Sequence, residues 1–142
     1  MNDRYLFRGK RVDNGEWVIG YYHQAKYFKS DDDLIDFITI PHPDIKNADN
    51  DIFIVIPETV GQCTGLKDKN GKLIFEWDIL MFTNDDGEKT PYKVKWSTSL
   101  AQYIISMGDR IFDTMDYWDK WIEYYEIIGN THDNPELLEV ER

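Results

Sequence analysis

The sequence has one cysteine and no long apolar run, and each of these two scarcities excludes a class of protein. Of its 142 residues, one is Cys and five are Pro. The lone Cys63 cannot form an intrachain disulfide, which excludes the disulfide-rich scaffolds of small secreted domains. No stretch approaches the ~18 apolar residues of a membrane-spanning helix, and the N-terminal MNDRYLFRGKR lacks the apolar core of a secretory signal. We therefore expect a cytoplasmic protein that does not act in the membrane.

Positive charge is also scarce. The chain has 16 Lys and Arg against 27 Asp and Glu, a net charge of −11. Residues 1–29 carry +3, residues 30–58 carry −7, residues 59–100 are neutral and residues 101–142 carry −7. A phosphate backbone is bound by clustered cations, and the negative electrostatic field of this chain would repel it. The sequence predicts no direct contact with nucleic acid, but the two acidic blocks leave open an acidic mimic of nucleic acid that inhibits a DNA-binding protein.

Apolar and aromatic residues are plentiful. They make up 42% and 15% of the chain, with 7 Phe, 9 Tyr and 5 Trp. A chain of this length forms about one domain and buries roughly two-thirds of its unfolded surface. We expect a single domain over 1–142, without a metal or cofactor to complete its core.

Short β-type runs separated by turn residues dominate the sequence. Alternating or β-branched patterns predict strands at 5–7, 16–22, 34–40, 52–56, 78–82, 92–96, 101–107 and 124–128. The run 52–56 consists of five apolar residues, which predicts a strand buried on both faces. Prolines 41 and 43 predict a loop over 41–51. Apolar spacing predicts a short helix over 114–122, and Asn134 followed by Pro135 predicts a second helix start.

Residues 67–75 predict a hairpin. Asn70-Gly71 suits a type I′ turn, in which both central residues have positive φ, and residues 73–75 would form the returning strand. The fold class that follows is mainly β, with small multi-stranded sheets and one or two short helices.

Four segments resemble the YopX family of phage and prophage proteins. The central run 57–79, PETVGQCTGLKDKNGKLIFEWDI, is the longest and most specific. The opening YLFRGK at 5–10, GEWVIGYY at 15–22 and the ending IIGNTHDNPELL at 127–138 are also similar to that family. The resemblance covers nearly the whole chain and implies an SH3-like barrel in the later half, 57–142, after N-terminal strands and an acidic loop in 1–56. It implies a bacterial host cell as the location, and no activity.

The chain departs from the family pattern at two positions. Cys63 stands where an aromatic residue is usual, and Trp77 stands where the pattern Phe-Glu-Gly-Asp-Ile has Gly. A glycine at that position indicates positive φ, which a Trp residue adopts at a cost of ~1 kcal/mol or more. The backbone at Trp77 is therefore the local geometry most in question.

No motif in the sequence predicts a catalytic or metal site. A calcium loop with Gly71 at its sixth position would need ligands at Leu66 and Trp77, which cannot bind calcium. His23, His42 and His132 lack metal-ligand spacing, and 31–33 is best interpreted as a solvated run of charge. Cys63 has no base near it in sequence, and 61–65 lacks the lysine of a phosphate loop.

The C-terminal region is dense in aromatic residues, which are enriched at protein interfaces as well as in cores. The candidates for an interaction surface are Tyr103, Tyr117, Trp118, Trp121, Tyr124 and Tyr125. The leading hypothesis is a phage-type accessory protein that binds another protein or self-assembles as an oligomer, with no catalytic activity evident. The alternatives are the acidic mimic and, third, an enzyme whose site combines distant carboxylates with a histidine such as His132.

Overall fold

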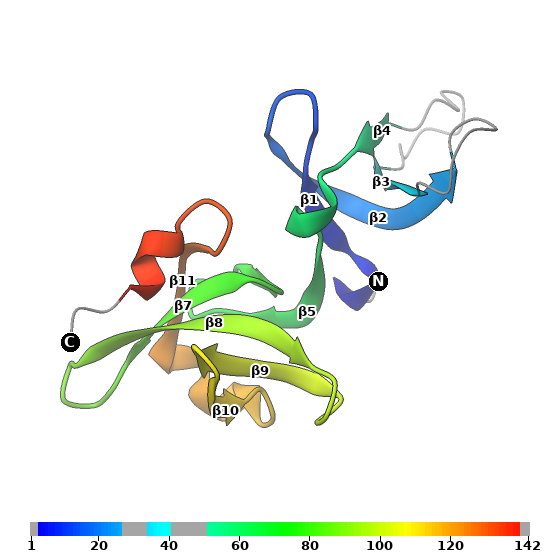
Figure 1. Ribbon diagram of the computed structural model, residues 1–142. Coiled ribbons are helices and arrows are strands. Elements are labelled where there is room, and N and C mark those ends of the chain that lie inside the picture. The colour runs from blue at the N-terminus through cyan, green and yellow to red at the C-terminus, as the bar shows by residue number, and fades with distance from the viewer. Residues whose placement is uncertain (1–2, 27–33, 41–50, 140–142) are drawn as a thin grey trace. The chain divides into compact units, whose positions relative to one another are not determined.

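The computed structural model describes residues 3–26, 34–40 and 51–139 (Figure 1). The chain divides into two compact units, Met1–Cys63 and Thr64–Arg142, which are taken in turn. Within the described residues, two antiparallel sheets of six and five strands account for most of the regular structure, and the one α-helix is short. The prediction of a mainly β fold is confirmed.

The first unit is built on the larger sheet. Its strands are β1 (Phe7–Lys10), β2 (Trp17–Lys26), β3 (Leu34–Ile40), β4 (Asp51–Ile54) and the start of β5 (Gly61–Lys67). The sheet order is β4-β3-β2-β1-β5-β6, and β5 runs across the division between the units. Short 3₁₀ turns, η1 (Asp3–Tyr5) and η2 (Pro57–Thr59), precede β1 and β5.

The core of the first unit lies where the backbones approach most closely. Ile38 and Val55 are almost completely buried. A Cβ on Gly20 would lie 2.4 Å from the carbonyl oxygen of Thr39, and one on Gly9 would lie 3.1 Å from the Val55 side chain. These contacts explain why both strands of the β1–β2 pair carry a glycine.

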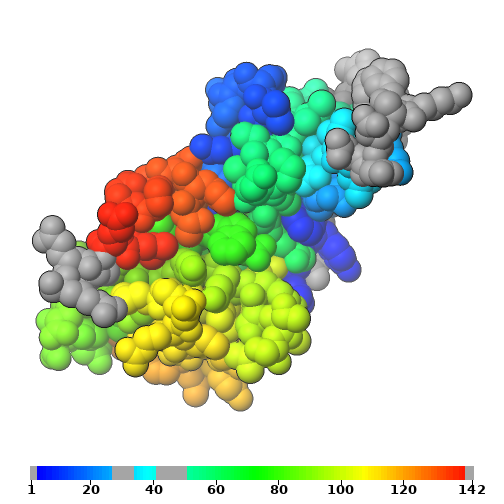
Figure 2. All heavy atoms as spheres, viewed as in Figure 1, coloured from blue at the N-terminus to red at the C-terminus, as the bar shows by residue number. Residues whose placement is uncertain are grey.

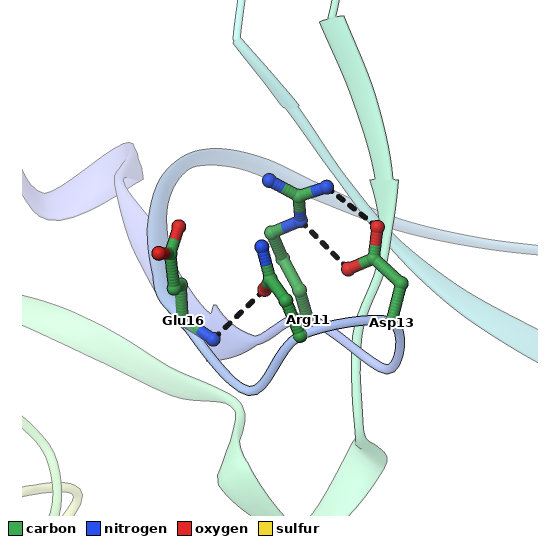
Figure 3. A network of polar contacts seen from close by, with 4 residues as sticks. Arg11, Asp13 and Glu16 are labelled. Carbon is green, nitrogen blue, oxygen red and sulfur yellow. Dashed lines mark hydrogen bonds and ion pairs between the residues drawn. The ribbon is translucent and has the colours of Figure 1, made fainter.

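The turn between β1 and β2 is held by its own polar side chains (Figure 3). The Arg11 guanidinium donates to both carboxylate oxygens of Asp13, at 2.9 and 2.6 Å, and the amide of Glu16 donates to the side-chain oxygen of Asn14. The backbone of this turn bonds to the end of β4, because the Val12 amide donates to the Ile54 carbonyl. In Figure 2 the turn lies against the segment that follows β4.

The structure corrects the prediction for residues 52–56. β4 ends at Ile54, and Ile52 and Ile54 are exposed, whereas only Val55 is buried. The strand is not buried on both faces, because β4 lies at the edge of its sheet with one face toward solvent. Of the predicted loop, Asp51 belongs to β4 and 41–50 lies outside the described residues.

The second unit is built on the five-stranded sheet, ordered β10-β9-β8-β7-β11. Its elements are β6 (Leu73–Phe75), β7 (Asp78–Thr83), β8 (Lys89–Ser97), β9 (Gln102–Met107), β10 (Arg110–Thr114), α1 (Trp118–Trp121), η3 (Ile122–Tyr124), β11 (Tyr125–Asn130) and η4 (Pro135–Leu138). The core of this unit gathers Ile74, Leu80, Tyr92, Val94, Tyr103, Ile105, Met115, Trp118 and Tyr125. The predicted helix over 114–122 is shorter than expected, because β10 extends to Thr114 and the left-handed backbone of Tyr117, with φ 54°, delays the start of α1 to Trp118.

The five-stranded sheet is strongly curled. Phe82 on β7 and Phe112 on β10 have ring centroids 5.3 Å apart, although their strands are three positions apart in the sheet. In a flat sheet that separation would be roughly 14 Å at ~4.8 Å per strand. No strand pairing among the described residues closes the sheet into a barrel. Side chains, rather than hydrogen bonds, therefore meet across its concave face.

The hairpin predicted at 67–75 forms, but with another turn type. Only Gly71 of this turn has positive φ, at 81°, so the turn is not type I′. The Asp68 carboxylate holds it by accepting hydrogen bonds from the amides of Asn70 and Lys72 at 2.9 and 3.0 Å. Its other oxygen accepts from the amide of Ile127 on β11, at 2.9 Å. Asp68 is thus a fully buried structural carboxylate.

Candidate functional site

Of the six aromatic residues proposed from the sequence, three are buried, two are exposed and Tyr124 is half-buried. Tyr103, Trp118 and Tyr125 are buried in the core of the second unit. The Trp118 ring stacks on that of Tyr125 at 4.7 Å, and its indole N–H donates to the carbonyl of Lys67 at 2.7 Å. These three side chains pack inside the unit, so the structure does not place them on an interaction surface.

Two of the six are clearly exposed, and both belong to the α1 segment. Tyr117 is 78% exposed and Trp121 is 45% exposed. Tyr117 directly precedes α1, and Trp121 is the last residue of α1. Tyr117 itself has φ 54°, so the helix starts from a left-handed residue.

The sequence did not single out Phe112, which the structure adds to the exposed group. Phe112 is 44% exposed and its neighbour Ile111 is 50% exposed. The β10–β9 register shifts between Ile111 and Asp113, so Phe112 is the extra residue of a β-bulge. A bulge redirects a side chain, and here the Phe112 ring stacks on Tyr92 at 4.2 Å. Two adjacent apolar residues directly after the Gly108 turn were the available signal.

A continuous row of rings joins Phe112 to Trp121. Phe82 contacts Phe112 at 5.3 Å and Tyr124 at 5.9 Å, and Tyr124 contacts Trp121 at 5.9 Å. The Tyr124 hydroxyl donates to Asp85 at 2.9 Å, which fixes the middle of the row. We call Ile111, Phe112, Tyr117 and Trp121 the aromatic surface. The rings of Phe112 and Trp121 are held by these contacts, so binding through them would cost little side-chain entropy.

The aromatic surface is bordered by carboxylates. Residues 109–126 contain six Asp and Glu against one Arg and one Lys. Exposed carboxylates lie on β10 and around α1, at Asp113, Asp116, Asp119 and Glu123. Burial raises the pKa of Tyr125 and of Tyr92 beneath the surface, and the hydrogen bond to Asp85 raises the pKa of Tyr124. All three phenols are therefore neutral at physiological pH.

A small pocket opens beside this surface. It is lined by Tyr92, Met107, Arg110, Ile111 and Phe112 and has a volume of about 230 Å³. Small-molecule sites are usually larger, at roughly 300–1,000 Å³, and contain several convergent polar groups. This pocket has the size and apolar lining to receive a side chain of a partner.

The residues weighed for catalysis or metal binding do not converge. Cys63 is completely buried in the first unit, and the Asp68 loop is occupied by its own amides. His23 stacks on Phe37 at 5.1 Å and His132 meets the edge of Trp77 at 6.4 Å. Over residues 3–26, 34–40 and 51–139, no three His, Cys, Asp or Glu side chains lie together as a metal site would require. His42 and Asp31–Asp33 lie outside the described residues.

The two acidic blocks differ in how many of their carboxylates lie within the described residues. Most carboxylates of the first block, 30–58, lie outside the described residues, while Asp36 of that block is buried and accepts hydrogen bonds from Tyr22 and Gln24. Of the second block, Asp113, Asp116, Asp119 and Glu123 are exposed and are neighbours in sequence of the aromatic surface. Within the described part of the chain, no helix has the length and apolar character needed to cross a membrane.

Comparison with known proteins extends over nearly the whole chain. The model of the family described as YopX protein matches residues 6–139. The chain is 36% identical over 72 residues to the SPbeta prophage-derived uncharacterized protein YopX of Bacillus subtilis (strain 168), a match that covers 49% of this chain and 52% of that protein. The chain thus spans about half the length of the curated relative it matches. The crystal structure of protein EF1440 from Enterococcus faecalis is similar with a TM-score of 0.51 and 25% identity, covering 94% of this chain and 96% of that one.

Proposed function

The chain belongs to the YopX family, and from this premise we propose that it is a phage-type accessory protein that acts by binding another protein chain through the aromatic surface. The observation that carries the proposal is the preorganised row of rings that ends in exposed Phe112 and Trp121. Aromatic residues held rigid at a surface contribute much of the affinity of protein interfaces. The prophage origin of the Bacillus subtilis relative supports the phage origin of this chain and a bacterial cytoplasm as its place of action.

Binding, rather than catalysis, fits the chemistry of the surface. Its centre is apolar, its rim is acidic, and the adjoining pocket contains one charged side chain, Arg110. A protein interface commonly has this arrangement of an apolar centre and a polar rim. The contact can be made with a partner protein or with another copy of this chain.

We also infer that the five-stranded sheet is an SH3-like barrel that closes through side chains. The contact of Phe112 on β10 with Phe82 on β7 supports it, as does a second bulge in β11 between Ile127 and Gly129, because bulges increase the bend of a sheet.

The test of the proposed function is to remove the exposed rings. The double variant Tyr117→Ser/Trp121→Ser should lose at least about 30-fold in affinity, because truncating a central aromatic anchor typically costs 2 kcal/mol or more. Oligomeric state by multi-angle light scattering, and capture of proteins from phage-infected host cells quantified by mass spectrometry, are the measurements. Trp96→Ser, at a 42% exposed Trp on β8, is the matched control and should leave association unchanged. If the wild type, Tyr117→Ser/Trp121→Ser and Trp96→Ser associate equally, the proposal is refuted.

A further inference from the structure

The first unit exposes an apolar face across β2, β3 and β4, and the paired positions that the structure describes on this face carry no carboxylate. Residues directly opposite one another in an antiparallel pair lie on the same face of a sheet. The pairs Tyr21↔Thr39↔Ile52 and His23↔Phe37↔Ile54 therefore form two neighbouring rows across β2, β3 and β4. Of these side chains, Ile52 is 58% exposed and Ile54 is 47% exposed, and Tyr21 is exposed as well. We call Ile19, Tyr21, Ile52 and Ile54 the apolar face.

The charged side chains at the described paired positions of this face are cationic. The same register places Arg8 opposite Ile19 and Lys10 opposite Trp17, on the face that carries Tyr21. Both cations lie over the Trp17 ring, at 4.9 and 5.6 Å from its centroid. Asp36 and Asp51, the carboxylates of β3 and β4, occupy the alternate positions of their strands and belong to the opposite face. In a protein with a net charge of −11, this face has a cationic end and no Asp or Glu among the paired positions of β1 to β4.

A pocket lies at the edge of the apolar face. It has a volume of about 350 Å³ and is lined by Arg11, Val12, Asp13 and the β4 residues Ile52, Phe53 and Ile54. Arg11 is fixed by Asp13 and lies 4.4 Å from the centroid of the Phe53 ring. The Arg11–Asp13 pair and the Phe53 ring thus hold one wall of the pocket in place, and the pocket is large enough for an aromatic side chain.

The chain thus carries two surfaces that complement each other. The aromatic surface presents rings within an acidic rim, and the apolar face presents aliphatic residues, a pocket and a cationic end. We propose that the apolar face of one copy binds the aromatic surface of a second copy, so that the chain assembles head to tail. This inference rests on the proposed function, because it names the partner of the aromatic surface.

A head-to-tail contact has a consequence that a symmetric dimer lacks. The two surfaces of a contact are different, so each copy retains one unused surface of each kind and assembly continues into a ring or a filament. Opposite charges at the contact also make the association weaker at high salt.

Complementation between two variants tests this arrangement. One variant, Tyr117→Ser/Trp121→Ser, lacks the aromatic surface, and the other, Ile52→Ser/Ile54→Ser, lacks the apolar face. Leu34→Ser is the matched control for the second variant, since Leu34 is an exposed aliphatic residue at an alternate position of β3. Sedimentation velocity is measured on each protein alone and on an equimolar mixture of the two double variants, with circular dichroism to establish that each is folded.

We expect the wild type and Leu34→Ser to form oligomers, each double variant alone to be monomeric, and the mixture to form dimers of one chain of each kind and nothing larger. Raising NaCl from 50 to 500 mM should weaken the wild-type association at least tenfold. A monomeric wild type, a monomeric mixture, or undiminished association of Ile52→Ser/Ile54→Ser would overturn the inference. In the last case, loss of association by Tyr117→Ser/Trp121→Ser alone would still support the proposed function, whereas undiminished association of that variant would refute both.

Discussion

Trp77 has the backbone conformation that the family pattern assigns to glycine. Its φ is 75°, in the left-handed region, as its position in the Phe-Glu-Gly-Asp-Ile pattern predicts. The strained residue is held on both sides, because its amide donates to the Val94 carbonyl at 2.7 Å and its carbonyl accepts from the Thr131 amide at 2.9 Å. The side chain is half-buried and meets His132 edge-on. The fold tolerates the strain because two hydrogen bonds and a ring contact fix the turn.

Comparing two substitutions isolates the backbone cost at Trp77. Trp77→Ala and Trp77→Gly both remove the side chain, but only glycine adopts positive φ without penalty. We expect Trp77→Gly to be more stable than Trp77→Ala by about 1 kcal/mol in urea unfolding. At Trp96, on β8, the same pair should show the opposite order, because glycine weakens a strand interior by roughly 0.5–1 kcal/mol relative to alanine. The same order at both positions would contradict the assignment.

Asp68 is the buried carboxylate that joins the 67–72 hairpin to β11. Three backbone amides donate to its two oxygens, and an asparagine could accept on only one of them. Asp68→Asn should therefore lower the free energy of unfolding by about 2–4 kcal/mol, because it leaves a buried amide without its acceptor. The matched control is Asp86→Asn, at an exposed turn position, with an expected change within about 0.5 kcal/mol. Equal effects of the two substitutions would show that Asp68 does not organise the hairpin.

At the scale of single elements, a close contact explains the glycine in the motif at 127–138. A Cβ on Gly129 would lie 2.5 Å from the side-chain oxygen of Asn134. Asn130 and Asn134 hold this turn, since the Asn134 amide donates to the Asn130 carbonyl at 2.8 Å. The turn leads from β11 into η4, and the motif therefore specifies a compact turn rather than a site.

A double-mutant cycle measures that contact. Gly129→Ala should cost about 1–3 kcal/mol through overpacking, and it should cost less when Asn134 is already alanine. Gly108→Ala is the control: its φ of 58° makes the substitution unfavourable, but no atom lies within 4 Å of the new Cβ, so its effect should simply add to that of Asn134→Ala. Additive effects of Gly129→Ala and Asn134→Ala would rule out the close contact.

Sequence patterns correctly predicted the strands that are specified by their own residues. The strand at 34–40 and the returning strand at 73–75 agree with the structure, and so does the positive φ at Trp77 that the resemblance to the family implied. The predictions failed where tertiary context decides. The run 52–56 was expected to be buried, but its place at the sheet edge exposes Ile52 and Ile54. The turn at Asn70-Gly71 was expected to be type I′, but the buried Asp68 holds a different turn.

The same distinction holds for the candidate site. Aromatic density drew attention to the C-terminal region, but composition cannot tell which rings face inward. Tyr103, Trp118 and Tyr125 pack in the core of a curled sheet, while Phe112 is turned by a bulge that no local pattern indicates. The sequence did not bring the apolar face together either, because its members come from two strands, β2 and β4, that only the sheet register places on one face.

At the scale of the whole molecule, buried phenols make stability depend on alkaline pH. Burial, with the hydrogen bond from Tyr22 to the Asp36 carboxylate, raises the pKa of Tyr22 to about 12, and burial raises the pKa of Tyr125 and Tyr92. The folded state holds these protons more tightly than the unfolded state, whose tyrosines titrate near pH 10. Their contribution to stability is thus complete below pH 10 and is lost as the pH rises through the folded-state values.

We therefore expect the free energy of unfolding to fall between pH 10 and pH 12, with part of the slope due to Tyr22. The net charge of −11 adds to the effect, because ionising phenols and neutralising lysines make the chain more negative and increase repulsion within the folded state. Tyr22→Phe keeps the ring but removes the titrating hydroxyl, so its slope over this interval should be shallower than that of the wild type. Urea unfolding at pH steps from 9 to 12 gives both slopes, and absorbance at the phenolate band follows ionisation directly. Parallel slopes for the two proteins would show that Tyr22 titrates alike in the folded and unfolded states. The Tyr22–Asp36 hydrogen bond would then not contribute to the stability of the first unit.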